Sequence, residues 1–188
     1  MVQHLLLTLV AAPLFVLGAP VTALLRATRG RIRRALARAA TSRPAVVATH
    51  PLVTWTVFAL VMWFVHFSFL YEAALDNEIV HVFEHWLFVG AGLLFWMPVI
   101  GSDPVSRRRL AWPARLGYLV AALPFQSFLG LAIYSSDRPL YDAYPDLDDQ
   151  RLGATIMWLG GDFVFVIALA LVVGAWMRAD RAEGAVRV

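Results

Sequence analysis

Residues 79–100 read IVHVFEHWLFVGAGLLFWMPVI, and the class of fold is clearest in this run. Its length matches the ~20 apolar residues that a helix needs to cross the hydrocarbon core of a bilayer. Its three ionisable residues, His81, Glu84 and His85, all lie near its start, and Pro98 and Gly101 mark its end. The pattern therefore predicts a transmembrane helix with polar side chains at one end.

Other apolar runs of similar length lie on both sides of it. They cover residues 2–25, 51–71, 113–134 and 152–177. Proline inside such helices is tolerated because neighbouring groups satisfy the carbonyls that it frees, and we expect a kink at Pro124. We therefore predict an all-α integral membrane bundle of about five transmembrane helices, forming a single domain over residues 1–188.

The composition excludes an ordinary soluble domain. Hydrophobic residues make up 60% of the 188 residues and charged residues 15%, against roughly 45–50% and about 25% in soluble domains. The mean hydropathy is +0.68. The chain has no cysteine, which excludes a disulfide framework, a thiolate zinc site and thiol redox chemistry.

Charges of opposite sign are separated along the chain. The 16 basic residues are all arginine, and most lie in 26–50, in 101–115 and in the C-terminal tail, whereas acidic residues dominate 72–78 and 135–151. The positive-inside rule places arginine-rich connections in the cytoplasm, so we predict an outer N-terminus and a cytoplasmic C-terminus. The net charge of +3 then reflects topology, and we predict no nucleic-acid partner.

The first run has the position of a secretory signal but lacks its basic start. Pro20 would also directly follow a cleavage after Ala19, which a signal peptidase site disfavours. We expect a retained helix whose inner half is bent by proline.

Four of the five histidines fall near the outer ends of the predicted helices. His4 opens the first run, His66 lies near the end of the second, and His81 and His85 open the third. At ~1.5 Å rise per residue, all four come within roughly 4–10 Å of the outer boundary. The fifth, His50, lies on the inner side, where we expect an interfacial residue.

The spacing of these histidines favours a metal site. His81 and His85 are four residues apart on one helical face, and Met62 and His66 repeat that spacing. Imidazole suits zinc, copper, iron and nickel, and thioether favours copper(I). Ionisable residues in a membrane segment are costly and usually face the bundle interior. We therefore predict metal ligation by His4, His66, His81 and His85.

Further side chains near these histidines are predicted as auxiliary groups. Met62 and Met157 would add weak thioether ligation or would simply pack in the core. Glu84 would accept a hydrogen bond that orients an imidazole, or would pair with another helix. Asp162 follows two glycines that allow close helix approach. We expect it to pair with a polar group such as Gln126, or to relay ions or metal.

Other interpretations of the histidines stay open. Each can be an interhelical hydrogen-bond partner instead. Paired histidines on facing helices can ligate haem, and His66 with His85 has a suitable depth. Residues 81–85 also match the H-x-x-E-H pattern of zinc peptidases. A hydrolase would need a further ligand, a water-accessible cleft and a substrate groove, and we expect no enzyme.

Short motifs follow one another along nearly the whole chain. They are MVQHLLL at 1–7, GAP at 18–20, HP at 50–51, WFVHFSFLY at 63–71, HVFEH at 81–85, LFW at 94–96, PLY at 139–141, DQ at 149–150, and then Gly153 and MW at 157–158. In order and spacing they resemble the CtaG family of cytochrome c oxidase assembly factors, which is associated with caa-type oxidases.

The resemblance implies a role in delivering copper to the oxidase, at the copper B centre of its catalytic subunit. It implies His4, His66, His81 and His85 as copper ligands. The expected partners are that subunit and the lipid bilayer of a bacterial plasma membrane, with a homo-oligomer also allowed. A metal-free structural subunit of an oxidase is the remaining alternative. Family members usually have about seven helices, so we expect either a short member or further helices before Met1.

Overall fold

The computed structural model describes residues 2–103, 110–144 and 146–186. Every regular element in these ranges is helical, which confirms the predicted all-α class. In chain order the elements are α1 (Val2–Leu5), the π-helix η1 (Leu6–Ala11), α2 (Ala12–Leu17), α3 (Pro20–Ala27), α4 (Gly30–Ala40), α5 (Arg43–Ala48), α6 (Pro51–Phe67), α7 (Phe69–Asp76), α8 (Glu78–Ile100), α9 (Trp112–Tyr134) and α10 (Leu147–Val186).

Within the described residues, α8, α9 and α10 are each long and apolar enough to cross a membrane. Two bent helix pairs bring the number of candidate spans to as many as five: Val2–Leu17 with α3, bent by 40°, and α6 with α7, bent by 65°. Large apolar side chains such as Leu14, Phe128 and Leu171 are exposed, as expected for surfaces that face lipid. These helices fit the predicted membrane bundle.

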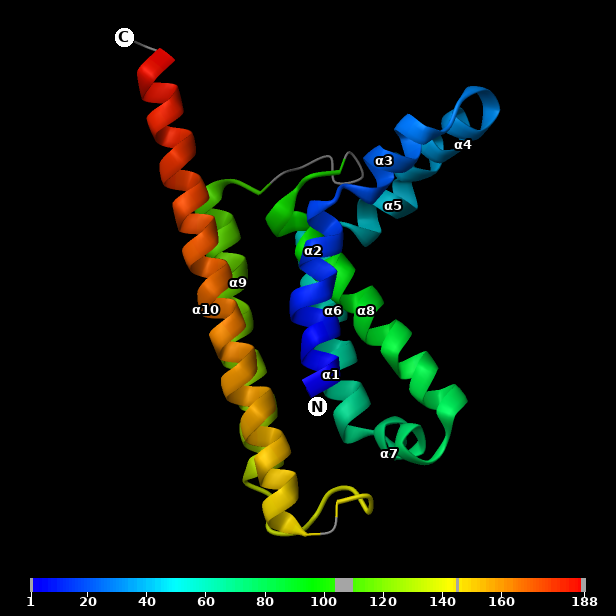
Figure 1. Ribbon diagram of the computed structural model, residues 1–188, viewed down its shortest axis with the longest axis vertical. Helices are drawn as coiled ribbons and strands as arrows, with labels where there is room; N and C mark the ends of the chain where they lie inside the picture. Colours follow the sequence, from blue (N-terminus) through cyan, green and yellow to red (C-terminus); the bar gives the residue numbers. More distant parts are fainter. Residues whose placement is uncertain (1, 104–109, 145, 187–188) are drawn as a thin grey trace.

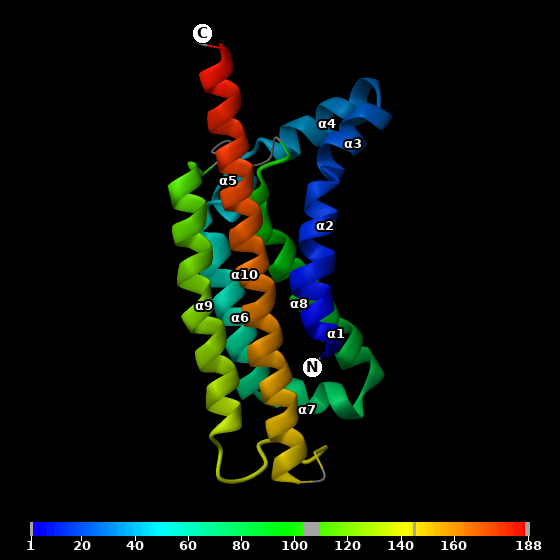
Figure 2. The same cartoon turned by 60° about the vertical axis from the view of Figure 1, so that its left-hand side comes forward.

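The long helices lie side by side, and the arginine-rich and the acidic connections lie at opposite ends of the bundle (Figure 1). Helices α9 and α10 run together along the bundle, next to α6, α8 and the α1–α2 segment, as both views show (Figure 2). The arginine-rich segment α3–α5 and the C-terminal end of α10 share one end, and α7 and the acidic connection between α9 and α10 share the other. Which end faces the cytoplasm stays a prediction.

Several helix ends differ from the ranges expected from hydropathy. The run 51–71 continues as one helix only to Phe67, because Ser68 is extended (φ −113°, ψ 171°) and its hydroxyl caps α7 by accepting the N–H of Leu70. The arginine-rich connection contains the short helices α4 and α5, and α10 extends beyond 152–177 at both ends. Hydropathy detects apolar stretches, and capping geometry decides where each helix stops.

The bend predicted before Pro20 is present. Ala19 has a left-handed backbone (φ 49°), and Pro20 begins α3 without an N–H to satisfy. The cap comes from far along the chain, since Asp103 accepts hydrogen bonds from the N–H groups of Val21 (3.2 Å) and Thr22 (2.8 Å). The end of α8 thus fixes the direction in which α3 leaves the bundle.

The π-helix η1 fixes the N-terminal segment against α8. The N–H of Ala12 bonds to Leu7 rather than to Thr8, and Pro13 has no N–H to take over the Thr8 carbonyl. That carbonyl instead accepts the indole N–H of Trp96 at 3.1 Å. Gly92 completes the contact, because a Cβ there would lie 3.0 Å from the same carbonyl oxygen. His4, one turn before Thr8, is thereby held beside α8.

Candidate metal site

Potential metal ligands from α1 and α8 converge near the start of α8. His4, His81, Glu84 and His85 each offer one ligand atom, and these atoms all lie within 4.8 Å of one another. The imidazole centroid of His4 lies 5.0 Å from that of His85 and 6.4 Å from that of His81. His81 and His85 are neighbours on α8, with centroids 4.4 Å apart. These four residues are called the histidine–glutamate group below.

Glu84 is the most buried member of the group. Its residue is 1% exposed, and one carboxylate oxygen, Oε2, lies 3.3 Å from Nε2 of His4. The other, Oε1, is buried without a hydrogen-bond partner among the described residues. A buried carboxylate is costly unless it is paired or coordinates a metal. The contact with His4 of α1 agrees with both roles predicted for Glu84, as an acceptor for an imidazole and as a partner for another helix, and the convergence of ligand atoms adds its carboxylate to the candidate ligands.

Hydrogen bonds to the helix backbone fix the protonation pattern of two imidazoles. Nδ1 of His85 lies 2.8 Å from the carbonyl oxygen of His81, and Nδ1 of His66 lies 2.7 Å from that of Met62. A carbonyl oxygen only accepts, so Nδ1 carries a proton in both rings, and in the neutral imidazole Nε2 is then the nitrogen with the lone pair. This is how second contacts orient histidine ligands in metal sites.

Several buried polar atoms around the group have no partner within the part of the chain that the structure describes. They are His4 Nδ1, Glu84 Oε1, His85 Nε2 and His66 Nε2. Most buried side-chain polar atoms in proteins are hydrogen-bonded, so a cluster of exceptions requires an explanation. A bound cation would supply it for the imidazole lone pairs and the carboxylate together, and the donor set suits zinc, copper, iron or nickel.

His66 lies close to this group but outside it. It is 3% exposed and stacks on Tyr71 with centroids 5.5 Å apart. Phe88 contacts both histidines, with centroid distances of 4.6 Å to His4 and 5.8 Å to His66. Of the predicted ligands, the structure therefore brings His4, His81 and His85 together, and it places His66 beside Phe88 and outside that group.

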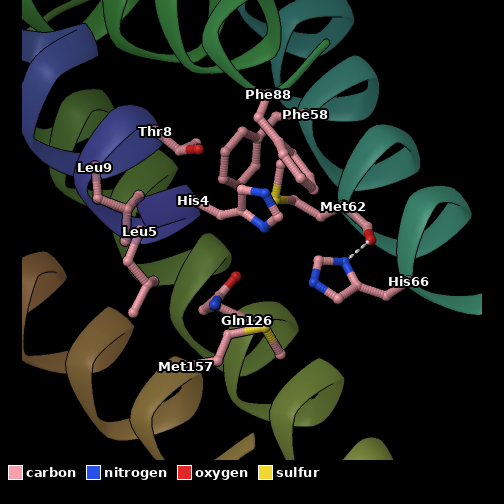
Figure 3. A pocket seen from close by; sticks show the side chains of 10 residues that line it. All are labelled: His4, Leu5, Thr8, Leu9, Phe58, Met62, His66, Phe88, Gln126 and Met157. Carbon is pink, nitrogen blue, oxygen red and sulfur yellow. Dashed lines mark hydrogen bonds between the residues drawn. The ribbon is translucent and has the colours of Figure 1, made fainter. Parts of the chain in front are cut away.

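A small cavity separates His4 from His66 (Figure 3). Its volume is about 20 Å³, enough for roughly one water molecule and far below the ~300 Å³ or more of an ordinary ligand pocket. The predicted auxiliary residues Met62 and Met157 line it, as does Gln126. A porphyrin between His66 and His85 would require the helices to separate.

Asp162 belongs to a different contact. Oγ of Ser127 lies 2.9 Å from each of its carboxylate oxygens, joining α9 to α10. The expected partner Gln126 instead packs against Gly161, where a Cβ would lie 3.1 Å from the amide. A polar partner on the neighbouring helix was predicted correctly, but the residue was wrong by one. His50 caps α6 through Nδ1, which accepts the N–H of Leu52 at 3.3 Å.

A residue of the connection between α9 and α10 is hydrogen-bonded to His66, a contact that the sequence analysis did not predict. The hydroxyl of Tyr141 donates to the carbonyl oxygen of His66 at 2.8 Å, and burial raises the pKa of Tyr141 above its ordinary value, so the phenol stays a donor. Gln150, fully buried, donates to the Ile133 carbonyl at 3.2 Å. Both residues fall within the PLY and DQ motifs quoted above, which were the available signal.

Residues 1–179 match the family model described as cytochrome c oxidase caa3 assembly factor (Caa3_CtaG). Uncharacterized proteins of Mycobacterium bovis (Mb0105) and Mycobacterium tuberculosis (MT0111) are each 30% identical to the chain over 96% of its length, and one of Mycobacterium leprae (ML1998) is 27% identical over 96%. The chain spans 30% of the length of these relatives. No solved structure is significantly similar to it.

The helical membrane fold with a buried polar group defines the class, a multi-pass α-helical membrane protein with a candidate metal site. The match over residues 1–179 then places the chain in a particular family: it belongs to the Caa3_CtaG family of cytochrome c oxidase assembly factors. This confirms the family that the sequence motifs resembled, and it supports assembly of the oxidase as the family's role.

Proposed function

We propose that the chain binds copper at the histidine–glutamate group and delivers it to the catalytic subunit of cytochrome c oxidase, at the copper B centre. The observation that carries this proposal is the convergence of four donors from two helices within 4.8 Å, with buried atoms of His4, Glu84 and His85 left without partners among the described residues. The family supplies the oxidase as client, and the metal is cargo rather than a resident cofactor.

The properties of the group suit a carrier. Imidazole and carboxylate bind copper without the thiolates that would retain it more strongly, and the chain has no cysteine. The group lies in the first turns of α8, near the end where the connection between α9 and α10 carries Asp137, Asp142 and Asp146. These carboxylates would attract a cation at the outer face of a bacterial plasma membrane. Release then needs only ligand exchange with the partner, and no catalytic step.

The proposal is tested by measuring copper bound to the purified chain and copper B content of the oxidase in cells. His81→Ala and His85→Ala should each reduce both, while the protein still inserts. The matched control is His50→Asn, which removes an imidazole at the other end of α6 but keeps a good helix cap. If the histidine variants leave a fully copper-loaded oxidase, the proposed function is wrong.

The same preparation separates the alternatives. A Soret band on the pure protein would support a haem-binding cytochrome, and zinc without copper together with loss of function in Glu84→Gln would support a hydrolase. An oxidase subunit without metal would tolerate His81→Ala. The small cavity beside His66 and the direct contact between Glu84 and His4 favour a compact ion site over either alternative.

A further inference from the structure

The cavity beside His4 has a donor chemistry of its own. Its lining includes the imidazoles of His4 and His66 and the thioethers of Met62 and Met157, and most of the other lining side chains are apolar. Among the described residues, no carboxylate lines it. The histidine–glutamate group, in contrast, includes the buried carboxylate of Glu84. The two places share only His4.

His66 is held with its open nitrogen toward this cavity. Its Nδ1–H donates to the carbonyl of Met62 at 2.7 Å, and the hydroxyl of Tyr141 holds the His66 carbonyl at 2.8 Å. Nε2 is buried and has no hydrogen-bond partner among the described residues. In Figure 3 this nitrogen lies on the side of the ring that faces the other lining residues. The unpartnered Nε2 of His66 therefore faces the cavity.

The two methionines reach the cavity from different helices. Met62 lies one turn before His66 on α6, and Met157 comes from α10. Both are buried, as core methionines usually are, so burial alone says little. What distinguishes them is that they line the same small cavity as an unpartnered imidazole nitrogen.

We infer that this cavity is a second copper station, selective for copper(I), with His66 Nε2 and the thioethers of Met62 and Met157 as its ligands. The inference rests on the proposed function, and it adds a second binding position for the copper and assigns copper(I) as the oxidation state bound there. Thioether and imidazole without carboxylate favour copper(I) over zinc and other harder ions. The cavity volume of about 20 Å³ corresponds to roughly one water-sized occupant, so a small ligand such as a single ion is the size that fits.

His4 connects the two stations. Its Nε2 lies 3.3 Å from Glu84 in the first group, and its ring forms part of the wall of the cavity (Figure 3). An ion can therefore exchange Glu84, His81 and His85 for His66 and the methionines while it stays in contact with the His4 side chain. The copper keeps its oxidation state throughout, so the transfer needs no reductant.

The test is anaerobic titration of the full chain in detergent with copper(I), against a chromophoric copper(I) chelator, and separately with zinc(II). We expect two copper(I) equivalents and one zinc(II) equivalent. Met62→Leu/Met157→Leu, which keeps the side-chain volume, should lose one copper(I) equivalent or weaken it about tenfold or more while keeping the zinc(II) equivalent. Met177→Leu, an exposed methionine on α10, is the matched control and should change neither.

X-ray absorption at the copper edge provides a readout without any substitution. The protein loaded with two equivalents should show copper–sulfur scattering, and growth with selenomethionine should convert it to copper–selenium scattering. Absence of a sulfur shell, or an unchanged copper(I) stoichiometry in the double leucine variant, would overturn the second station. The proposed function would still stand if the first group bound one equivalent of zinc(II) and one of copper(I). Failure of the proposed function would instead appear as no metal bound to the wild type at all.

Discussion

Two polar contacts within the spanning helices, the histidine–glutamate group and the pair Ser127–Asp162, differ in one decisive respect. Both carboxylate oxygens of Asp162 lie 2.9 Å from the Ser127 hydroxyl, so each has a hydrogen-bond donor within reach. In the histidine–glutamate group, Glu84 Oε1 and His85 Nε2 are buried without partners among the described residues. A polar side chain in a membrane helix therefore indicates a site only when its atoms are left unsatisfied.

The difference follows from what each contact does for the helices. Ser127 and Asp162 join α9 to α10 next to Gly161, whose missing side chain allows close approach to Gln126. Such hydrogen bonds between membrane helices contribute about 0.6 kcal/mol on average. The histidine–glutamate group contains one ion pair, between His4 and Glu84, and leaves Glu84 Oε1 and His85 Nε2 without partners among the described residues. Packing accounts for the first contact, and the proposed cation would account for the second.

The double variant His81→Ala/His85→Ala should show the largest difference between the two contacts, as a loss of copper affinity. Removing both imidazoles from α8 should reduce copper affinity by more than the ~10–100-fold that follows from losing only the supporting groups of a ligand. Binding is measured by competition with a chelator and by elemental analysis. Asp162→Asn is the matched control at the other contact. A variant that still binds copper like the wild type would contradict the assignment of the group.

A smaller effect is expected from Glu84→Gln. The amide keeps the size of the carboxylate and its contact with His4 but removes the negative charge, so affinity should fall by about 10–100-fold while the helices stay packed. Circular dichroism checks the fold and chelator competition checks the affinity. If this variant bound copper as tightly as the wild type, Glu84 would have a purely structural role, as Asp162 is expected to have.

Asp162→Asn and Ser127→Ala should affect stability alone. We expect a loss of about 0.6 kcal/mol and at most ~1.7 kcal/mol in the free energy of unfolding, as for other hydrogen bonds between membrane helices. The measurement is unfolding by denaturant in mixed micelles, with metal affinity determined on the same samples. A tenfold change in copper affinity would show that Asp162 takes part in ion handling after all.

The most local effect is expected from Tyr141→Phe. It removes the hydroxyl that donates to the His66 carbonyl and should cost about 0.5–1.5 kcal/mol, because that carbonyl can be satisfied by little else. Hydrogen exchange in the connection between α9 and α10 should speed up while exchange in α8 does not. Tyr134→Phe, an exposed tyrosine at the end of α9, is the control. If hydrogen exchange in this connection were the same in both variants, the Tyr141 hydroxyl would not be what holds the connection to His66.

Much of the polar neighbourhood could be read from the sequence because it depends on depth. The predicted helices placed His4, His66, His81 and His85 near one boundary, since depth follows from the rise per residue. Proximity also requires each helix to be turned toward its neighbour, and no single run of sequence specifies that. His66 illustrates the limit, because it has the right depth but stays outside the group whose ligand atoms converge within 4.8 Å.

The sequence by itself determined the membrane helices, the separation of arginine from acidic connections and the family, because these are properties of composition, length and the order of motifs. Only the tertiary structure decided that His4 joins His81, Glu84 and His85 and that His66 faces a separate cavity. The physical reason lies in features that act across the chain. The π-helix leaves the Thr8 carbonyl to Trp96 and so fixes how the N-terminal segment is turned against α8, and the break at Ser68 ends α6 just beyond His66.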